Sequence, residues 1–274
     1  MKSRLPWLAA GILLAFVGIL TWWNFGKNKS PYITFEGKAF ATNYSVTYLR
    51  GPELKIAKEA VEAELERIDS IASSWNQESE LMRYGRSPDL QAFHLSSDLA
   101  FLLKRSNEIE QQTAGAFSIH HHSKHLDLSA IAKGYAVDQI VGILRSHFNI
   151  QDCLVEIGGE IKASGNGPSG SNWQVGIYSP SSPTPQFELQ NTSIATSGND
   201  LKGEHIIDPR DLQKKQNHLF SASVIHPSNT TADALATALF VMGPEAGLKW
   251  AREHHIHTIF ILKDGTQLEH IPNK

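Results

Sequence analysis

The sequence predicts an α+β fold. Helix-like and strand-like segments follow one another in blocks, without the strict alternation that is typical of a parallel sheet. The strand-like runs are separated by turns rich in Gly, Pro and Ser, such as 165–170 and 179–183. The chain has 274 residues, 41% of them hydrophobic, so it is long enough for one large domain or two small ones.

The N-terminal segment, residues 1–30, is read separately from the fold. Lys2 and Arg4 precede an uncharged run over 5–23, a pattern that is typical of an export signal. The run is about long enough to cross a bilayer as a helix. Because 21–24 is bulky and offers no small-x-small cleavage site, we favour an uncleaved signal anchor over a cleaved signal peptide. The remaining chain would then lie outside the cytoplasmic membrane.

The helices are predicted from apolar residues that recur every three or four positions. The first helix, over 53–72, gains one apolar face from Leu54, Ala57, Val61, Leu65, Ile68 and Ile71. A second helix, over 97–113, starts at Ser-Asp and ends just before Gly115. Further helices are predicted over 130–148, 232–242 and 245–254.

Strands are predicted where β-branched and aromatic residues alternate with polar ones or form short apolar runs. These segments are 44–49, 153–157, 173–178, 186–190, 193–196, 220–225 and 258–262. Cys153, the single cysteine, lies in one of these runs and cannot form an internal disulfide. We therefore expect a buried core thiol. The formal net charge of -3 provides no field that would attract a nucleic acid, so no nucleic-acid partner is expected.

Asp233 and Thr237 form the first candidate site. They are four residues apart in a predicted helix, so they share one face. A carboxylate and a hydroxyl there can both offer oxygen to a hard cation such as Mg²⁺. The alternative is an aspartate at a helix start, where the helix dipole favours it, with Thr237 merely packed.

The segment 127–138, Asp-Leu-Ser-Ala-Ile-Ala-Lys-Gly-Tyr-Ala-Val-Asp, forms the second candidate site. Asp127 precedes a helix that contains Lys133 and Gly134. A helix start beside a lysine suits a phosphate group, and a glycine inside a helix usually marks the close approach of something bulky. The alternative is a capping aspartate with a glycine that allows two helices to pack.

Two further segments have weaker signals. Gly158 and Gly159 end a predicted strand, where they fit either the close approach of a ligand or a β-bulge. His205 precedes an Asp-Pro turn and is a candidate general base, because imidazole titrates near neutrality. A lone histidine of this kind is otherwise a surface residue.

Together these segments resemble the FAD:protein FMN transferase family, the ApbE-like flavin transferases. The matching pieces are 41–44, 74–81, 115–117, 127–138, 157–159, 197–198, 205–209 and 232–243. The resemblance covers essentially all of residues 37–262. It implies a single ApbE-like, T-fold-related domain over 31–274, with mixed or antiparallel sheets and packed helices behind the N-terminal membrane anchor.

The resemblance also implies an activity and a set of site residues. Such enzymes bind FAD and Mg²⁺ and transfer FMN to a threonine of a partner protein, releasing AMP. The implied metal ligands are Asp233, Thr237 and the backbone carbonyl of Ala130, and His205 would activate the incoming hydroxyl. The positions that fall at the family's flavin-nucleotide site are Phe40, Trp75, Ala116, Phe117, Asp127, Lys133, Gly158, Gly159 and Ser197. The implied acceptor is an exported or membrane-bound redox protein on the periplasmic side of the inner membrane.

The chain departs from the family pattern at three places. Phe40-Ala41 replaces Met-Gly, although a phenylalanine can still stack on a flat ring. Ser118 replaces an aspartate, and this change motivates one alternative, a flavin-binding protein without transfer activity. A further alternative is an Mg²⁺-dependent FAD pyrophosphatase that uses water as the nucleophile. The segment between Phe117 and Asp127 is short and contains His120, His121, His122 and His125. It is either a solvated loop or a transition-metal site.

Overall fold

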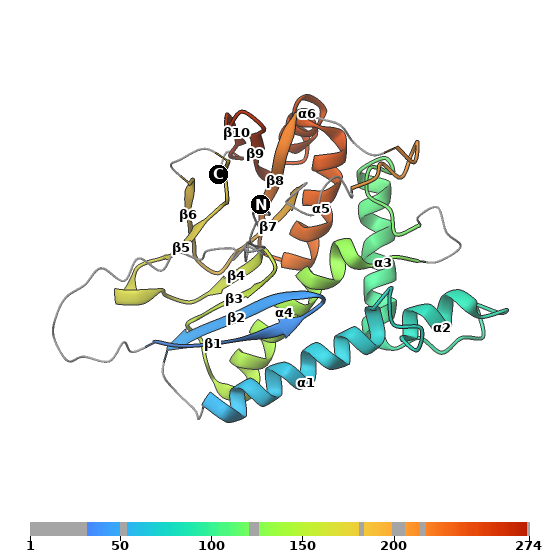
Figure 1. Cartoon of the computed structure of the whole chain (residues 1–274), viewed down its shortest axis with the longest axis horizontal. Helices are drawn as coiled ribbons and strands as arrows, with labels where there is room; N and C mark the ends of the chain where they lie inside the picture. Colours follow the sequence, from blue (N-terminus) through green and yellow to red (C-terminus); the bar gives the residue numbers. More distant parts are fainter. Residues whose placement is uncertain are drawn as a thin grey trace, which may run out of the picture.

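The computed structural model describes residues 32–49, 54–120, 126–180, 184–198, 206–213 and 218–272. Its main feature is an eight-stranded sheet with the order β1-β2-β3-β4-β7-β8-β9-β10 and antiparallel pairing throughout (Figure 1). The strands are β1 (Tyr32–Ala39), β2 (Thr42–Leu49), β3 (Cys153–Ile157), β4 (Glu160–Ser164), β7 (Ser193–Gly198), β8 (Leu219–His226), β9 (His257–Leu262) and β10 (Gln267–His270). β5 (Trp173–Gly176) and β6 (Gln186–Leu189) form a separate hairpin. The predicted α+β class is confirmed.

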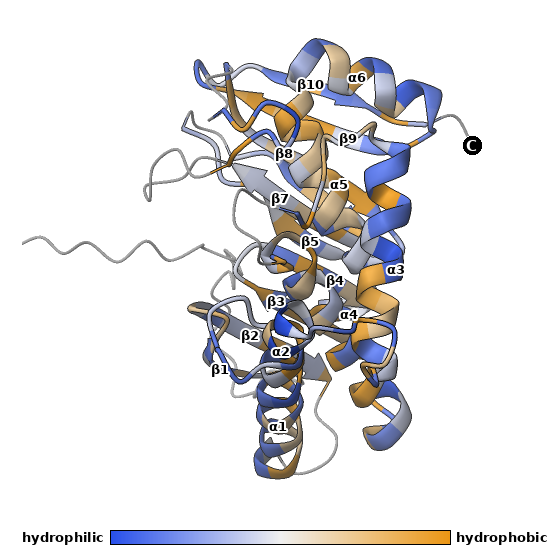
Figure 2. Cartoon of the chain, turned by 90° about the vertical axis from the view of Figure 1, so that its right-hand side faces the viewer, coloured by the Kyte–Doolittle hydropathy of each residue, from blue (hydrophilic) through white to orange (hydrophobic). Residues whose placement is uncertain are grey.

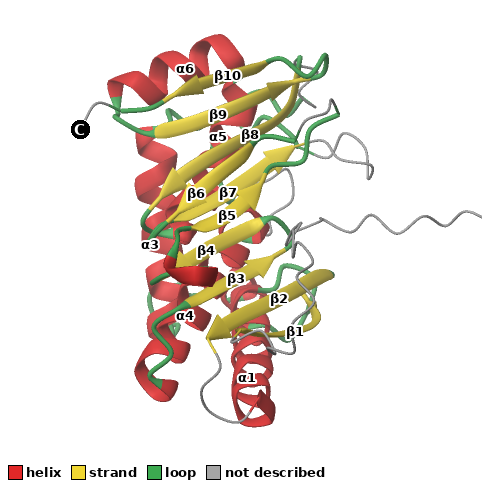
Figure 3. Cartoon of the chain, turned by 90° about the vertical axis from the view of Figure 1, so that its left-hand side faces the viewer, coloured by secondary structure: helices red, strands yellow, loops and turns green. Residues whose placement is uncertain are grey.

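The helices lie on one face of the large sheet (Figure 3). They are α1 (Leu54–Ala72), α2 (Glu80–Arg86), α3 (Ser97–Gln112), α4 (Ser129–Phe148), α5 (Asn229–Met242) and α6 (Pro244–Glu253), with a short 3-10 turn at Pro168–Gly170. α4 packs on β3 and β4, and α5 packs on β7 and β8. α5 also contacts α3, and Figure 2 shows the α5 ribbon mostly in the colours of hydrophobic residues.

Two hydrophobic cores lie on the two faces of the sheet. The larger core, between the sheet and the helices, contains fully buried side chains such as Tyr48, Ile140 and Phe240. The smaller core lies under the β5–β6 hairpin, where Trp173 and Leu189 are buried. Each such side chain contributes about 1.5–3 kcal/mol of hydrophobic stabilisation when fully buried. Both faces of the sheet are therefore covered along its middle strands.

The chain order repeats the same arrangement. One half of the sheet consists of β1–β4, with helices inserted in the chain between β2 and β3. The other half consists of β7–β10, with helices inserted between β8 and β9. The halves meet where α4 packs against α5. At this contact a Cβ added to Gly134 would lie 2.4 Å from the Asn229 carbonyl oxygen. Gly134 is thus a helix-packing glycine, as the second of the two sequence readings proposed.

Two tight turns shape one end of the sheet. The turn between β1 and β2 consists of Phe40 and Ala41, with φ angles of 50° and 57°. The turn between β3 and β4 consists of Gly158 and Gly159, with φ angles of 60° and 106°. Both are two-residue hairpins of the kind that requires positive φ, and a residue with a side chain held there costs roughly 1–2 kcal/mol. The glycine pair is therefore a hairpin turn, not the β-bulge considered above.

Most predicted elements are confirmed, and their ends need small corrections. The predicted helices correspond to α1, α3, α4, α5 and α6, and Cys153 is fully buried. α5 begins at Asn229, earlier than predicted, so Asp233 lies in its second turn and the helix-start reading of that residue is wrong. The sequence analysis did not predict β1, β4, β10 or α2. Residues 1–31, including the expected anchor, lie outside the described residues, and no helix among the described residues is long and apolar enough to cross a bilayer.

Candidate active site

Lys133 lies at the centre of a charged cluster between the two halves of the sheet. Its Nζ is 2.7 Å from Glu160 Oε1, on β4, and 3.6 Å from Asp233 Oδ1, on α5. Both carboxylates are almost completely buried, with 1% and 2% of each residue exposed. Burial alone would lower the pKa of Lys133, but Asp233 and Glu160 outweigh it and raise the pKa above its usual value. Lys133 therefore stays an ammonium at neutral pH.

The cluster holds one more acidic group than it holds ammonium groups. Burial raises the pKa of Glu160 above its usual value, the Lys133 ammonium opposes this rise, and the neighbouring Asp233 adds to it. The second carboxylate oxygen, Oε2, is buried and has no hydrogen-bond partner among the described residues. A buried carboxylate oxygen without a donor is costly. The cluster is thus short of positive charge or protons.

Asp233 is fixed by the other helix. Its Oδ2 accepts a hydrogen bond of 2.9 Å from the Gly134 backbone amide. In an α-helix this amide would donate to the carbonyl four residues earlier, which here belongs to Ala130. The Asp233 carboxylate therefore competes with the Ala130 carbonyl for one donor.

The three predicted metal ligands lie on the two packed helices α4 and α5. Thr237 follows Asp233 by one turn, and its hydroxyl oxygen lies 2.8 Å from that of Ser197 at the end of β7. Ala130 is the second residue of α4. This ligand set contains a single carboxylate, and no group of three or more His, Cys, Asp or Glu side chains arranged to hold a metal occurs in the described part of the chain.

A cavity of about 780 Å³ opens beside Lys133. Its wall is formed by the β1–β2 turn, α1, the segment 73–76 and the start of α4. Three of the predicted flavin-nucleotide contacts, Phe40, Trp75 and Lys133, line it. The volume is within the range of about 300–1,000 Å³ for small-molecule and cofactor sites. Trp75 is 87% exposed, which is unusual for a tryptophan and leaves its ring open to a flat ligand.

The cavity wall is electrically asymmetric. α1 contributes three carboxylates at helical spacing, Glu62, Glu66 and Asp69, whereas Lys38 and Lys133 lie elsewhere on the wall. Charges of opposite sign attract and like charges repel, more strongly where water is excluded. An anionic group of a ligand is therefore better accommodated on the lysine side than on the α1 wall, which suits a neutral, hydroxyl-bearing part.

Asp127 connects the Trp75 segment to α4. Its Oδ1 accepts hydrogen bonds from the Ser74 hydroxyl and the Ser129 amide, both at 2.8 Å. The Ser74 hydroxyl in turn accepts a hydrogen bond from the Leu128 amide. Asp127 thus stabilises the start of α4, as the capping alternative proposed, and at the same time fixes the residue next to Trp75.

The other predicted contacts do not line this cavity. They are Ala116, Phe117, Asp127, Gly158, Gly159 and Ser197. Ala116 and Phe117 are buried in the core, and Gly158 donates its amide to the Asn43 carbonyl. His205 and three of the clustered histidines, His121, His122 and His125, lie outside the described residues.

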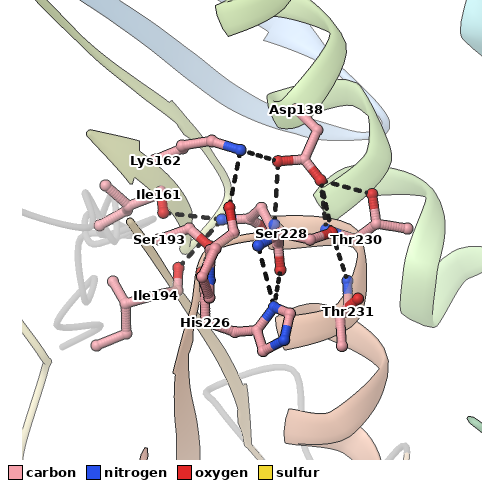
Figure 4. A network of polar contacts seen from close by, with 11 residues as sticks. Asp138, Ile161, Lys162, Ser193, Ile194, His226, Ser228, Thr230 and Thr231 are labelled. Carbon is pink, nitrogen blue, oxygen red and sulfur yellow. Dashed lines mark hydrogen bonds and ion pairs between the residues drawn. The ribbon is translucent and has the colours of Figure 1, made fainter. Parts of the chain in front are cut away.

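Asp138, at the middle of α4, holds the start of α5 (Figure 4). Its carboxylate accepts hydrogen bonds from the Asn229 and Thr230 amides and from the hydroxyls of Ser228 and Thr230. It also pairs with Lys162 Nζ at 2.6 Å. Because the first amides of a helix lack partners within the helix, an aspartate from a neighbouring helix stabilises this end. The same contacts fix the position of α5 along α4, and hence the position of Asp233 relative to α4.

Glu160 is a site residue that the sequence analysis did not single out. The signal for it is its position directly after Gly158-Gly159. A two-residue turn there places Glu160 opposite Ile157 in the register of β3 and β4. The turn could not be predicted from the sequence with certainty, because a pair of glycines can adopt positive φ angles but does not have to.

Fold and site together define an α+β domain with a buried lysine–carboxylate cluster beside a cofactor-sized cavity, an arrangement suited to a phosphorylated small molecule. The chain belongs to the ApbE family, whose family model matches residues 40–123 and 120–260. Relatives named FAD:protein FMN transferase include one from Haemophilus influenzae, 26% identical over 86% of this chain and 88% of the relative. Another, from Chlamydia muridarum, is 30% identical over 81% of this chain and 88% of the relative.

Solved structures show the same fold. The flavin transferase ApbE from Vibrio cholerae is 26% identical, with a TM-score of 0.79 over 89% of this chain and 98% of that one. The apo form of the flavinyl transferase ApbE from Pseudomonas stutzeri is also 26% identical, with a TM-score of 0.79 over 89% of this chain and 96% of that one. The antiparallel sheet with helices on one face is therefore the fold of this family.

Proposed function

We propose that this chain transfers FMN from FAD to a threonine hydroxyl of a partner redox protein and releases AMP, with Mg²⁺ as cofactor. The observation that carries the proposal is Lys133, held between two buried carboxylates on the wall of a cofactor-sized cavity in a member of the ApbE family. Relatives of this chain have the name FAD:protein FMN transferase.

The residues at the cluster suit Mg²⁺. Asp233 and Thr237 offer a carboxylate and a hydroxyl oxygen, and the Ala130 carbonyl shares its helical donor with Asp233. Mg²⁺ prefers such hard oxygen ligands and usually keeps several waters. The excess of buried acidic groups around Lys133 agrees with a site that receives a cation. A bound Mg²⁺ would neutralise charge on the phosphoryl oxygens.

The chain's own residues would bind and orient the reactants. Lys133 faces the cavity and would attract the diphosphate, while Trp75 and Phe40 offer rings for stacking on a flat ring of FAD. In the transfer, the acceptor oxygen forms a bond to the FMN phosphorus, the bond from that phosphorus to the bridging oxygen breaks, and AMP leaves. His205 would take the hydroxyl proton.

The pattern of the N-terminal segment supports a location for the reaction. An uncleaved anchor over residues 1–30 would hold the domain of residues 31–274 on the periplasmic side of the inner membrane. Its acceptor would then be an exported or membrane-bound redox protein.

The test incubates the full chain with FAD, Mg²⁺ and a candidate exported redox protein. We expect AMP release and an acceptor that gains the mass of FMN on a threonine, measured by mass spectrometry. The Asp233→Ala variant, checked for folding by its thermal midpoint, is expected to give no adduct. Free FMN without an adduct would indicate FAD hydrolysis, and tightly bound FAD that is never turned over would indicate a flavin-binding protein. Either result would contradict transfer.

A further inference from the structure

Lys133 has two carboxylate neighbours, and it is closer to the one that is not a proposed metal ligand. Its Nζ lies 2.7 Å from Glu160 Oε1, a short charge-assisted hydrogen bond, and 3.6 Å from Asp233 Oδ1, beyond hydrogen-bond distance. Glu160 is 1% exposed, and its backbone is fixed in β4 directly after a two-residue turn. The ammonium is thus drawn to one side of the cluster by a rigidly placed partner.

This asymmetry matters because an ammonium is a competitor for a cation ligand. If Lys133 moved to Asp233, it would neutralise the carboxylate that a divalent cation needs. Two positive charges close together in a buried site repel strongly. A lysine beside a metal ligand therefore needs something that holds it away from that ligand.

We propose that Glu160 is a positioning residue for the metal site. It holds the Lys133 ammonium away from Asp233, at the wall of the cavity, and leaves Asp233 Oδ1 available to the cation. This inference rests on the proposed function and adds a residue to it. Glu160 touches neither the substrate nor the cation in this account and acts only through Lys133.

Three variants distinguish the effect of the position of the Glu160 carboxylate from the effect of its charge. Glu160→Asp keeps the negative charge but withdraws it by one methylene, so Lys133 loses its close partner. Glu160→Gln removes the charge. The paired variant Lys133→Gln/Glu160→Gln removes one charge of each sign, so it keeps the net charge of the cluster and eliminates the competitor.

The measurement is Mn²⁺ binding to the full chain by electron paramagnetic resonance, without FAD or acceptor, so that the proposed contact of Lys133 with the diphosphate does not enter the comparison. We expect Glu160→Asp and Glu160→Gln to weaken Mn²⁺ binding by roughly ten- to a hundredfold, as for the loss of a hydrogen bond to a charged group. The paired variant is expected to bind Mn²⁺ within about threefold of wild type, since no ammonium then competes for Asp233 and the net charge is unchanged. Thermal midpoints and far-ultraviolet circular dichroism identify any variant that fails to fold.

Two results would overturn the inference alone. Glu160→Asp that binds Mn²⁺ as tightly as wild type would show that the position of the carboxylate does not matter. A paired variant as weak as Glu160→Gln would show that Glu160 acts on the cation itself. Wild-type enzyme that binds no Mn²⁺ would instead overturn the metal requirement of the proposed function, and this inference with it.

Discussion

The hydroxyl oxygens of Ser197 and Thr237 lie 2.8 Å apart and join the end of β7 to α5. Each hydroxyl has one proton and two lone pairs. When Thr237 donates its proton to Ser197, both lone pairs of Thr237 remain available to a cation on the α4 side. From the neighbouring strand, Ser197 thus orients Thr237, a proposed metal ligand. This role requires no direct contact between Ser197 and the nucleotide.

Thr237→Val is expected to weaken Mn²⁺ binding and slow flavin transfer by about ten- to a hundredfold, the range for groups that hold or orient a metal. The substitution keeps the shape of the side chain and replaces the ligand oxygen, together with its hydrogen bond to Ser197, by a methyl group. The matched control is Thr237→Ser, which keeps the hydroxyl and should stay close to wild type. Mn²⁺ titration and mass spectrometry of the acceptor measure the two effects. Equal behaviour of the valine and serine variants would remove Thr237 from the ligand set.

Trp75→Ala is expected to weaken FAD binding without unfolding the domain. A ring stacked on an aromatic ligand contributes about 1–3 kcal/mol, which corresponds to roughly 5- to 150-fold in the dissociation constant of FAD. Because Trp75 is 87% exposed, its removal should change the free energy of unfolding by less than about 0.5 kcal/mol. Quenching of FAD fluorescence gives the first quantity and urea denaturation the second, and Trp75→Phe should recover most of the affinity.

Asp138→Asn is expected to destabilise the protein by about 2–4 kcal/mol at pH 7, because it breaks a partly buried ion pair and the charged cap of α5. Burial opposes ionisation, but Lys162 and the hydrogen bonds from Thr230 lower the pKa of Asp138 below its usual value. A lowered pKa in the folded state gives stability that is complete above about pH 4, the value in the unfolded chain, and is lost as pH falls further. In urea denaturation, the difference in the free energy of unfolding between wild type and Asp138→Asn should therefore become smaller below pH 4. A constant difference across this range would contradict the role of the charge.

Gly134→Ala is expected to destabilise the protein by about 1–3 kcal/mol, the usual range for overpacking. The new Cβ would lie 2.4 Å from the Asn229 carbonyl oxygen and 2.8 Å from Asp233 Cβ, so α4 and α5 must separate. Gly142→Ala, in the same helix, is the matched control. It meets nothing within 4 Å and should stabilise the protein by up to about 1 kcal/mol through helix propensity. Urea denaturation that gives the two variants the same sign would contradict the close packing of these helices.

The elements that could be predicted are those with a strong local period. α1 repeats its apolar residues every three or four positions, and its predicted and observed ends differ by a single residue at the start. β1 was missed because it is an edge strand in which only Phe35 is buried, so its alternation is weak. Its turn, at Phe40 and Ala41, has neither Asn nor Gly to mark it. α2 is seven residues long, too short for its periodicity to be read.

The site was predicted only where its residues lie on one segment. The Asp233–Thr237 pair is visible as a spacing within one helix, and Lys133 as a residue near a helix start. Glu160 reaches Lys133 from a strand that begins 27 positions later in the sequence, and no local pattern connects the two. The same holds for Ser197, which meets Thr237 only because β7 lies under α5.

The division of the site between α4 and α5 also has a consequence for biogenesis. During synthesis the first half of the sheet can form while Lys133 and Glu160 already face each other. Asp233 and Thr237 enter the cluster only when α5 has docked, one hundred positions after Lys133. Contacts so distant in sequence form late, since the intervening chain must first be ordered. A nascent or truncated chain would therefore have a lysine–glutamate pair without its proposed cation site.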